Sequence, residues 1–264
     1  MENDGTGRER TTSWVARDGV ARPSVEARRQ AAPTETWVDR LHGLLGTPPS
    51  DGNQIGVLRN GDEIFPAMLS AVRGAERSVD FVTFVYWQGD IAVEFGKALS
   101  EDAARGVSVR VLLDALGARK ISAGLVDEMK RAGCEVRWFR PFFDGKVPKF
   151  TEANRRTHRK ILVCDGTVGF CGGVGIAEEW TGDARDATEW RDTHLEVRGP
   201  AVAGLHVAFL DNWADQNDDG FDPRDEPSIE LEPAGSSTCF VVRGSAETGA
   251  SDVWRLLMTL VGLA

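Results

Sequence analysis

One short segment of the sequence places a histidine, a lysine and an aspartate at spacings that suit phosphoryl transfer. His158, Lys160 and Asp165 form the pattern HxKxxxxD. Residues two positions apart on a strand project from the same face, so the imidazole of His158 and the ammonium of Lys160 are expected to lie side by side. A neutral imidazole can attack phosphorus, and a neighbouring cation can hold the non-bridging oxygens as negative charge develops. The pattern predicts attack on a phosphate ester by His158, and it requires no metal or other cofactor.

Asp165 has a second interpretation, because Gly166 follows it directly. An Asp-Gly pair between two apolar stretches is typical of a hairpin turn. The turn lies between the predicted strands 158–163 and 168–171. Asp165 is therefore expected to support the hairpin and its local hydrogen bonds rather than to transfer a proton.

The other three histidines carry weaker signals. His194 shares a predicted strand face with Asp192 and Glu196, which favours a structural salt bridge or hydrogen bond. His42 and His206 have no recognisable partner pattern and are predicted to be incidental.

The charge of the chain is unevenly distributed. The formal net charge is −10, which opposes broad adhesion to nucleic acid or to anionic lipid. Residues 137–160 nevertheless hold eight basic and two acidic side chains. This local excess indicates an anion site. The cysteines form no CxxC pair, which favours reduced, buried thiols: Cys134, Cys164, Cys171 and Cys239.

Helical and strand-like segments alternate in the part of the chain that must position these residues. The spacing of apolar residues predicts helices over 36–45, 63–75, 90–105 and 200–213, and a helical stretch that follows residue 113 and ends at 132. Strands are predicted over 78–87, 107–113, 134–139, 158–163, 168–171 and 193–197. Such alternation predicts an α/β fold whose mixed, mostly parallel sheet is flanked by helices.

An internal repeat suggests the domain organisation. Residues 63–75 align with residues 252–264 at an offset of 189, and Val57-Leu58-Arg59 resembles Val241-Val242-Arg243. We expect a mobile tail over 1–52, a half-domain over 53–214, a linker over 215–235 and the start of a truncated second repeat over 236–264. Residues 140–154 are expected to form a loop.

Several blocks together resemble one known family. FPAMLSAV, GVSVRVLLDALG, RTHRKILVCDG, FCGG and WRDTHLEVRGPAV are similar to the phospholipase D superfamily, and in particular to the first half of bacterial cardiolipin synthases. The similarity spans residues 55–213. It implies a phosphodiesterase or phosphatidyltransferase, with a phospholipid as substrate, that acts through a phosphohistidine.

The resemblance also implies roles for particular residues. His158 would be the nucleophile or its acid/base partner, and Lys160 would bind phosphate with Gly172 and Gly173 close by. Asp192 lies where the family often has an acidic residue that orients a histidine of the opposite half. The sequence departs from the family at Gly175, where an asparagine that contributes to phosphate binding is common.

Enzymes of this family bring two HxKxxxxD motifs to one site, whereas this sequence holds one. The repeat places a second histidine near position 347, beyond residue 264. The second motif would therefore come from another copy of the chain or from a missing half. Two alternatives stay open: a homodimeric nuclease, which the acidic charge disfavours, and an inactive half-domain. The sequence shows no apolar run long enough to cross a membrane, so a cytoplasmic chain with peripheral membrane contact is expected.

Overall fold

The computed structural model describes residues 14–17, 20–23, 36–141, 156–216, 231–244 and 252–263. The chain divides into two compact units, residues 1–44 and residues 45–264. In the first unit, β1 (Trp14–Arg17) and β2 (Val20–Pro23) pair antiparallel. The helix α2 (Trp37–Leu45) matches the helix predicted over 36–45.

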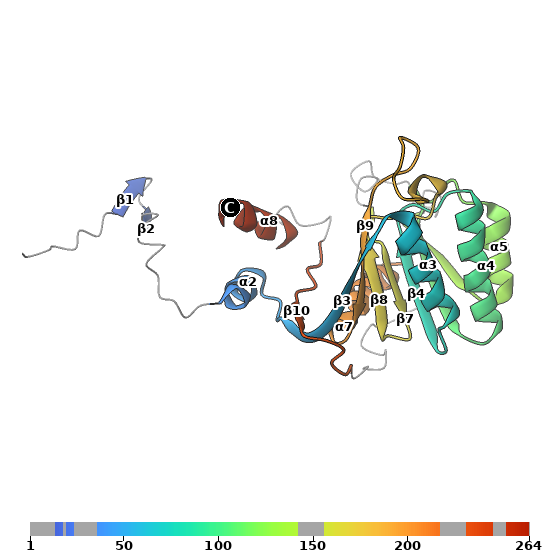
Figure 1. Cartoon of the computed structure of the whole chain (residues 1–264), viewed down its shortest axis with the longest axis horizontal. Helices are drawn as coiled ribbons and strands as arrows, with labels where there is room; N and C mark the ends of the chain where they lie inside the picture. The colour runs from blue at the N-terminus through green and yellow to red at the C-terminus, as the bar shows by residue number, and fades with distance from the viewer. Residues whose placement is uncertain are drawn as a thin grey trace, which may run out of the picture. The chain divides into compact units, whose positions relative to one another are not determined.

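The second unit contains one eight-stranded sheet with the order β10-β3-β9-β8-β7-β4-β5-β6 (Figure 1). The strands are β3 (Ser50–Arg59), β4 (Ser78–Thr83), β5 (Ser108–Asp114), β6 (Glu135–Phe139), β7 (Ile161–Cys164), β8 (Val168–Gly172), β9 (Thr193–Arg198) and β10 (Ser237–Cys239). The helices are α3 (Asn60–Arg73), α4 (Asp90–Ala104), α5 (Ala123–Ala132), α7 (Ala201–Ala214) and α8 (Asp252–Leu263), with the short 3-10 helix η1 (Glu178–Trp180).

The mixed α/β class is confirmed, but the expectation of a mostly parallel sheet is wrong. Only β4–β5 and β5–β6 are parallel, and the other five neighbouring pairs are antiparallel. The two parallel pairs are those whose strands are joined through the helices α4 and α5. β7 and β8 are joined by a tight turn, and a tight turn can only join antiparallel strands.

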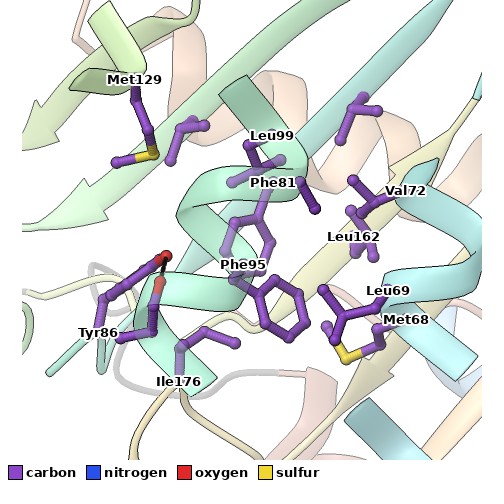
Figure 2. Packing of buried hydrophobic residues seen from close by; sticks show 14 of the residues in the cluster. Met68, Leu69, Val72, Phe81, Tyr86, Phe95, Leu99, Met129, Leu162 and Ile176 are labelled. Atoms are coloured by element: carbon purple, nitrogen blue, oxygen red, sulfur yellow. Dashed lines mark hydrogen bonds between the residues drawn. The ribbon is translucent and has the colours of Figure 1, made fainter. Parts of the chain in front are cut away.

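Helices cover both faces of the sheet, and each face has its own apolar core. On one face α3, α4 and α5 pack against alternate residues of β4, β5 and β7, and Phe81, Phe95 and Leu162 come together there (Figure 2). On the other face α7 packs against the intervening residues, which include Val82 and Val163. Because side chains alternate along a strand, β4 and β7 contribute to both cores.

Two predicted strands are shorter in the structure. The strand predicted over 78–87 ends at Thr83, and Tyr86 stays fully buried through an isolated bridge to Ile176. The strand predicted over 158–163 begins at Ile161. Most of the predicted loop 140–154 and of the predicted linker 215–235 lies outside the described residues.

Candidate active site

His158 and Lys160 lie in contact in the segment that leads into β7. The Lys160 Nζ is 2.9 Å from the His158 Nδ1, and it donates a hydrogen bond of 3.0 Å to the His158 carbonyl oxygen. The ring of Phe84 lies 4.7 Å from the imidazole of His158. The expected pairing of imidazole and ammonium is present, although both residues precede the strand on which the sequence placed them.

The surroundings favour a neutral imidazole beside a cation. Burial and the charge of Lys160 lower the pKa of His158 below its ordinary value. Burial also lowers the pKa of Lys160 to about 8, against the opposing effect of Asp192 and Asp114. At neutral pH His158 is therefore neutral and can act as a nucleophile, while Lys160 is largely protonated and can bind an anion.

A buried ion pair holds the backbone that leads to His158. The Arg156 Nε donates to both carboxylate oxygens of Asp114 at 3.1 Å, and the Arg156 guanidinium also donates to the carbonyl oxygens of Phe139 and Arg140. Asp114 is fully buried at the end of β5 and also accepts hydrogen bonds from the backbone of Leu116 and Gly117. Asp114 therefore both supports the turn that follows β5 and anchors the segment that leads to His158.

Asp192, His194 and the two glycines lie together where β8 ends beside β9. A Cβ added to Gly172 would lie 2.4 Å from the His194 Nδ1, and one added to Gly173 would lie 2.4 Å from an oxygen of Asp192. Only glycine allows this approach. Asp192 accepts a hydrogen bond of 3.0 Å from the Trp180 indole and acts electrostatically on Lys160.

The environment of His194 differs from the prediction. Its side chain is almost fully buried, burial lowers its pKa to about 4, and its Nδ1 has no hydrogen-bond partner among the described residues. Glu196 instead pairs with Arg198. The predicted structural bond is not seen at this atom, and His194 is a neutral imidazole next to the candidate site.

Asp165 is not brought to His158. It occupies the turn at the opposite end of β7, where Asp165 and Gly166 both adopt positive φ. Its carboxylate accepts backbone hydrogen bonds from Glu76, Arg77 and Ser78 at 2.7 to 3.0 Å. The structure thus favours the hairpin role over proton transfer.

We expect Asp165→Asn to lower the free energy of unfolding by about 1–2 kcal/mol at pH 7. Asparagine tolerates the positive φ, so the loss comes from the charged acceptor. Burial alone would raise the pKa of Asp165, but its three backbone hydrogen bonds hold it below the ordinary value. The stabilisation is present above about pH 3.9 and is lost as the pH falls through the folded pKa. Urea unfolding at several pH values checks this, and a difference that does not shrink in acid would contradict it.

Gly175, where the family commonly has asparagine, lies in a closed position. A Cβ there would be 2.6 Å from the Val85 Cβ and 3.1 Å from the Trp180 Cζ3. The position therefore cannot accept a side chain unless its neighbours move.

Restoring the family residue is expected to destabilise the fold. Gly175→Asn should cost about 1–3 kcal/mol of unfolding free energy because of the contact with Val85. Adding Val85→Gly removes the obstructing atoms, so the double variant should lose less stability than the sum of the two single losses. Urea unfolding of the four proteins measures this coupling, and strictly additive losses would disprove the steric explanation.

A cluster around the buried Asp80, between β4 and α7, was not predicted from the sequence. The His206 Nε2 lies 3.0 Å from the Asp80 Oδ2, and the Arg110 guanidinium donates to the same carboxylate at 2.6 and 3.0 Å. The prediction that His206 is incidental is wrong. Its partner lies on β4, far away in sequence, so no local spacing could indicate it; an aspartate within an apolar strand was the available signal.

Comparisons with known proteins show which family the chain resembles. Residues 68–187 match the family model described as cardiolipin synthase, PLD-like domain, where PLD stands for phospholipase D. The cardiolipin synthase of Geobacillus kaustophilus (strain HTA426) is 36% identical over 193 residues, which cover 72% of this chain and 38% of the relative. Cardiolipin synthase A of Pseudomonas fluorescens is 35% identical over 194 residues, which cover 73% and 40%.

A solved structure shares the fold. The crystal structure of phosphatidylserine synthase from Haemophilus influenzae Rd KW20 superposes with a TM-score of 0.50 at 14% identity, and the match covers 67% of this chain and 40% of that one. The chain spans about two fifths of the length of the curated relatives. The resemblance drawn from the sequence is confirmed: residues 68–187 match a phospholipase D-like domain model, and the chain is similar to bacterial cardiolipin synthases.

Proposed function

We propose that the chain is one catalytic half of a phospholipase D-like phosphodiesterase or phosphatidyltransferase that acts on a phospholipid through a phosphohistidine on His158. The observation that carries this proposal is the contact between the neutral imidazole of His158 and the ammonium of Lys160. The similarity to cardiolipin synthases supports the choice of a phospholipid. We propose that the lipid is reached by peripheral contact with a membrane. No described helix combines the length and the apolar composition that a membrane span needs.

The reaction has two displacements at phosphorus. An imidazole nitrogen of His158 forms a bond to phosphorus, the bond from phosphorus to the leaving alcohol breaks, and an acid gives that alcohol a proton. Water or a second alcohol then loses a proton to the resulting base, attacks phosphorus and releases the imidazole. Lys160 binds the non-bridging oxygens, and its charge is worth most where their negative charge is greatest.

Asp165 does not provide the acid that the first step needs. That carboxylate is occupied by the backbone of residues 76–78 at the far end of β7. We therefore propose that a second HxKxxxxD motif, from another copy of the chain or from the remainder of a longer protein, provides the histidine that protonates the leaving group.

The pairing of β3 with β10 supports the half-domain interpretation. The sequence alignment of the two strands matches Val57 with Val241, which lies 184 positions later. Asn53 and Ser237 are also 184 positions apart, and they face each other in the antiparallel register. Equivalent residues of antiparallel strands face each other when a twofold axis passes between them. We propose that 53–214 is one half, that 215–235 links it to the next, and that 236–264 begins a second half.

The helix α8 has the composition expected of an element that belongs to a larger core. Leu257, Met258, Leu260 and Val261 are exposed, although each is apolar. In the alignment α8 corresponds to α3, whose apolar face is buried in the first core. A further half-domain would bury the same face of α8.

Light scattering combined with a phosphodiesterase assay tests the proposal. A dimer that cleaves a phosphodiester supports assembly of the site from two copies. A monomer that cleaves at the same rate would contradict the need for a second motif. An inactive monomer would support the half-domain alternative and direct the assay to the longer protein.

The rate of cleavage is expected to depend on pH in two directions. With bis(p-nitrophenyl) phosphate, whose leaving group departs without a proton, it should rise as His158 loses its proton, below the ordinary histidine pKa of about 6.5, and fall above about pH 8 as Lys160 is deprotonated. Lys160→Arg should remove the alkaline fall, because a guanidinium keeps its charge there. Measurement of kcat/KM against pH checks this, and an unchanged alkaline fall in the arginine variant would contradict the assignment to Lys160.

A further inference from the structure

A cavity of about 780 Å³ begins at the His158–Lys160 pair and continues along the sheet face that α7 covers. Ile55, Leu195 and Val197 contribute its floor, and Leu205 and Ala208 of α7 contribute one wall. Residues 239–244, which begin at the last residue of β10, also line it, together with Val253 and Leu256 of α8. The volume is within the range of ligand pockets, about 300–1,000 Å³.

The two ends of this cavity differ in chemistry. One end holds Lys160, His158 and Gly172, which form the candidate phosphate site. Elsewhere the lining is mainly aliphatic, and its three arginines are engaged in ion pairs: Arg156 with Asp114, and Arg159 and Arg243 with Asp211 at 3.6 and 2.9 Å. The cavity therefore offers a cation and a nucleophile at one end and apolar surface beyond them.

The apolar walls are incompletely covered by protein. Ile55, Cys171, Leu195 and Val241 pack against the second core, yet each remains half-buried. The neighbouring core residues Val202 and Phe209 are fully buried. Apolar surface that faces an empty volume is stabilised when an apolar group fills it.

We propose that this cavity takes the hydrocarbon chain of an amphiphilic phosphate ester whose phosphate lies against His158 and Lys160. The inference rests on the proposed function, because it uses the same pair to hold the phosphate. It adds that this half selects its substrate by an apolar chain inside the fold as well as by the phosphate group. The phosphate and the hydrocarbon chain would then both be bound by the protein, without a bilayer.

Calorimetric titration with inorganic phosphate and with butyl, hexyl and octyl phosphate tests the inference, each below its micellar concentration. The chain-length series is expected to bind more tightly by about fourfold for each added methylene, since 0.8 kcal/mol per methylene corresponds to that factor. Val241→Trp fills the cavity and should abolish this dependence while phosphate still binds. Ile55→Phe, from the cavity floor, provides a second filling variant if the first fails to fold.

Val207→Trp is the matched control, because Val207 is exposed on the outer side of α7 and does not line the cavity. It should leave the chain-length dependence intact. Suppose that the original chain binds all chain lengths with equal affinity and binds inorganic phosphate, and that Lys160→Ala loses phosphate binding. This result would overturn the cavity inference and leave the proposed function standing. If Lys160→Ala still binds both inorganic phosphate and the alkyl phosphates, the proposed function is contradicted, and the inference that rests on it is contradicted as well. A filling variant that changes the oligomeric state of the chain would also overturn the inference, since a second copy would then cover the cavity.

Discussion

Replacement of His158 with alanine is expected to lower the rate of phosphodiester cleavage by about 10⁴-fold or more. The imidazole is the group that we assign to attack on phosphorus, and removal of a nucleophile leaves only the binding and electrostatic contributions of the site. Lys160 and the fold are unchanged by the substitution, so binding of inorganic phosphate should be retained. Measurement of kcat/KM and of phosphate affinity on the same preparation separates the two effects.

His42→Ala is the matched control for this experiment. His42 is exposed on α2 in the other compact unit, and the same substitution there should leave the rate within about twofold of the original chain. Equal losses at both histidines would indicate a general effect on the protein. Retention of the full rate by His158→Ala would contradict the assignment of the nucleophile.

Replacement of Arg156 with alanine is expected to lower the free energy of unfolding by about 3 kcal/mol. Asp114 is fully buried, and the Arg156 side chain that neutralises it is only 9% exposed. Removing one partner of such a pair leaves an uncompensated buried charge. The backbone of Leu116 and Gly117 still donates to Asp114, which keeps the loss at the lower end of the range for such pairs. Urea unfolding measures the change.

Two variants sharpen this prediction. Arg73→Ala breaks an ion pair with Glu94 in which both side chains are about half exposed, so it should cost no more than about 0.5 kcal/mol. Arg156→Lys keeps the charge but loses the fork that reaches both carboxylate oxygens, so its loss should be intermediate. A loss for Arg156→Ala as small as that for Arg73→Ala would show that the buried pair does not stabilise the fold.

Features that depend on neighbours in sequence were predictable. The Asp165-Gly166 pair predicts the turn between β7 and β8 because both residues accept positive φ. The two-residue spacing predicts the contact of Lys160 with His158, and the apolar periodicity predicts the helices that cover the sheet. Each of these follows from bonding rules that act within one or two turns of chain.

Features that depend on distant partners were not predictable. The pairing of His206 with Asp80 joins α7 to β4, and the closure around Gly175 depends on Val85 and Trp180. The direction of β3, β9 and β10 depends on which edges meet, which alternation of helix and strand does not specify. Such contacts arise only when separate elements pack together, so local spacing in a single sequence does not identify which residues will meet.

The phosphohistidine on His158 can be tested directly by trapping it. The chain is incubated with bis(p-nitrophenyl) phosphate, whose leaving group departs without a proton. The reaction is then quenched in alkali, and the chain is mapped by peptide mass spectrometry. We expect a mass increase of one nitrophenyl phosphoryl group on the peptide that contains His158, and no such increase in His158→Ala. Release of nitrophenol with the adduct on another residue, such as His194, or with no adduct at any time after quenching, would contradict it.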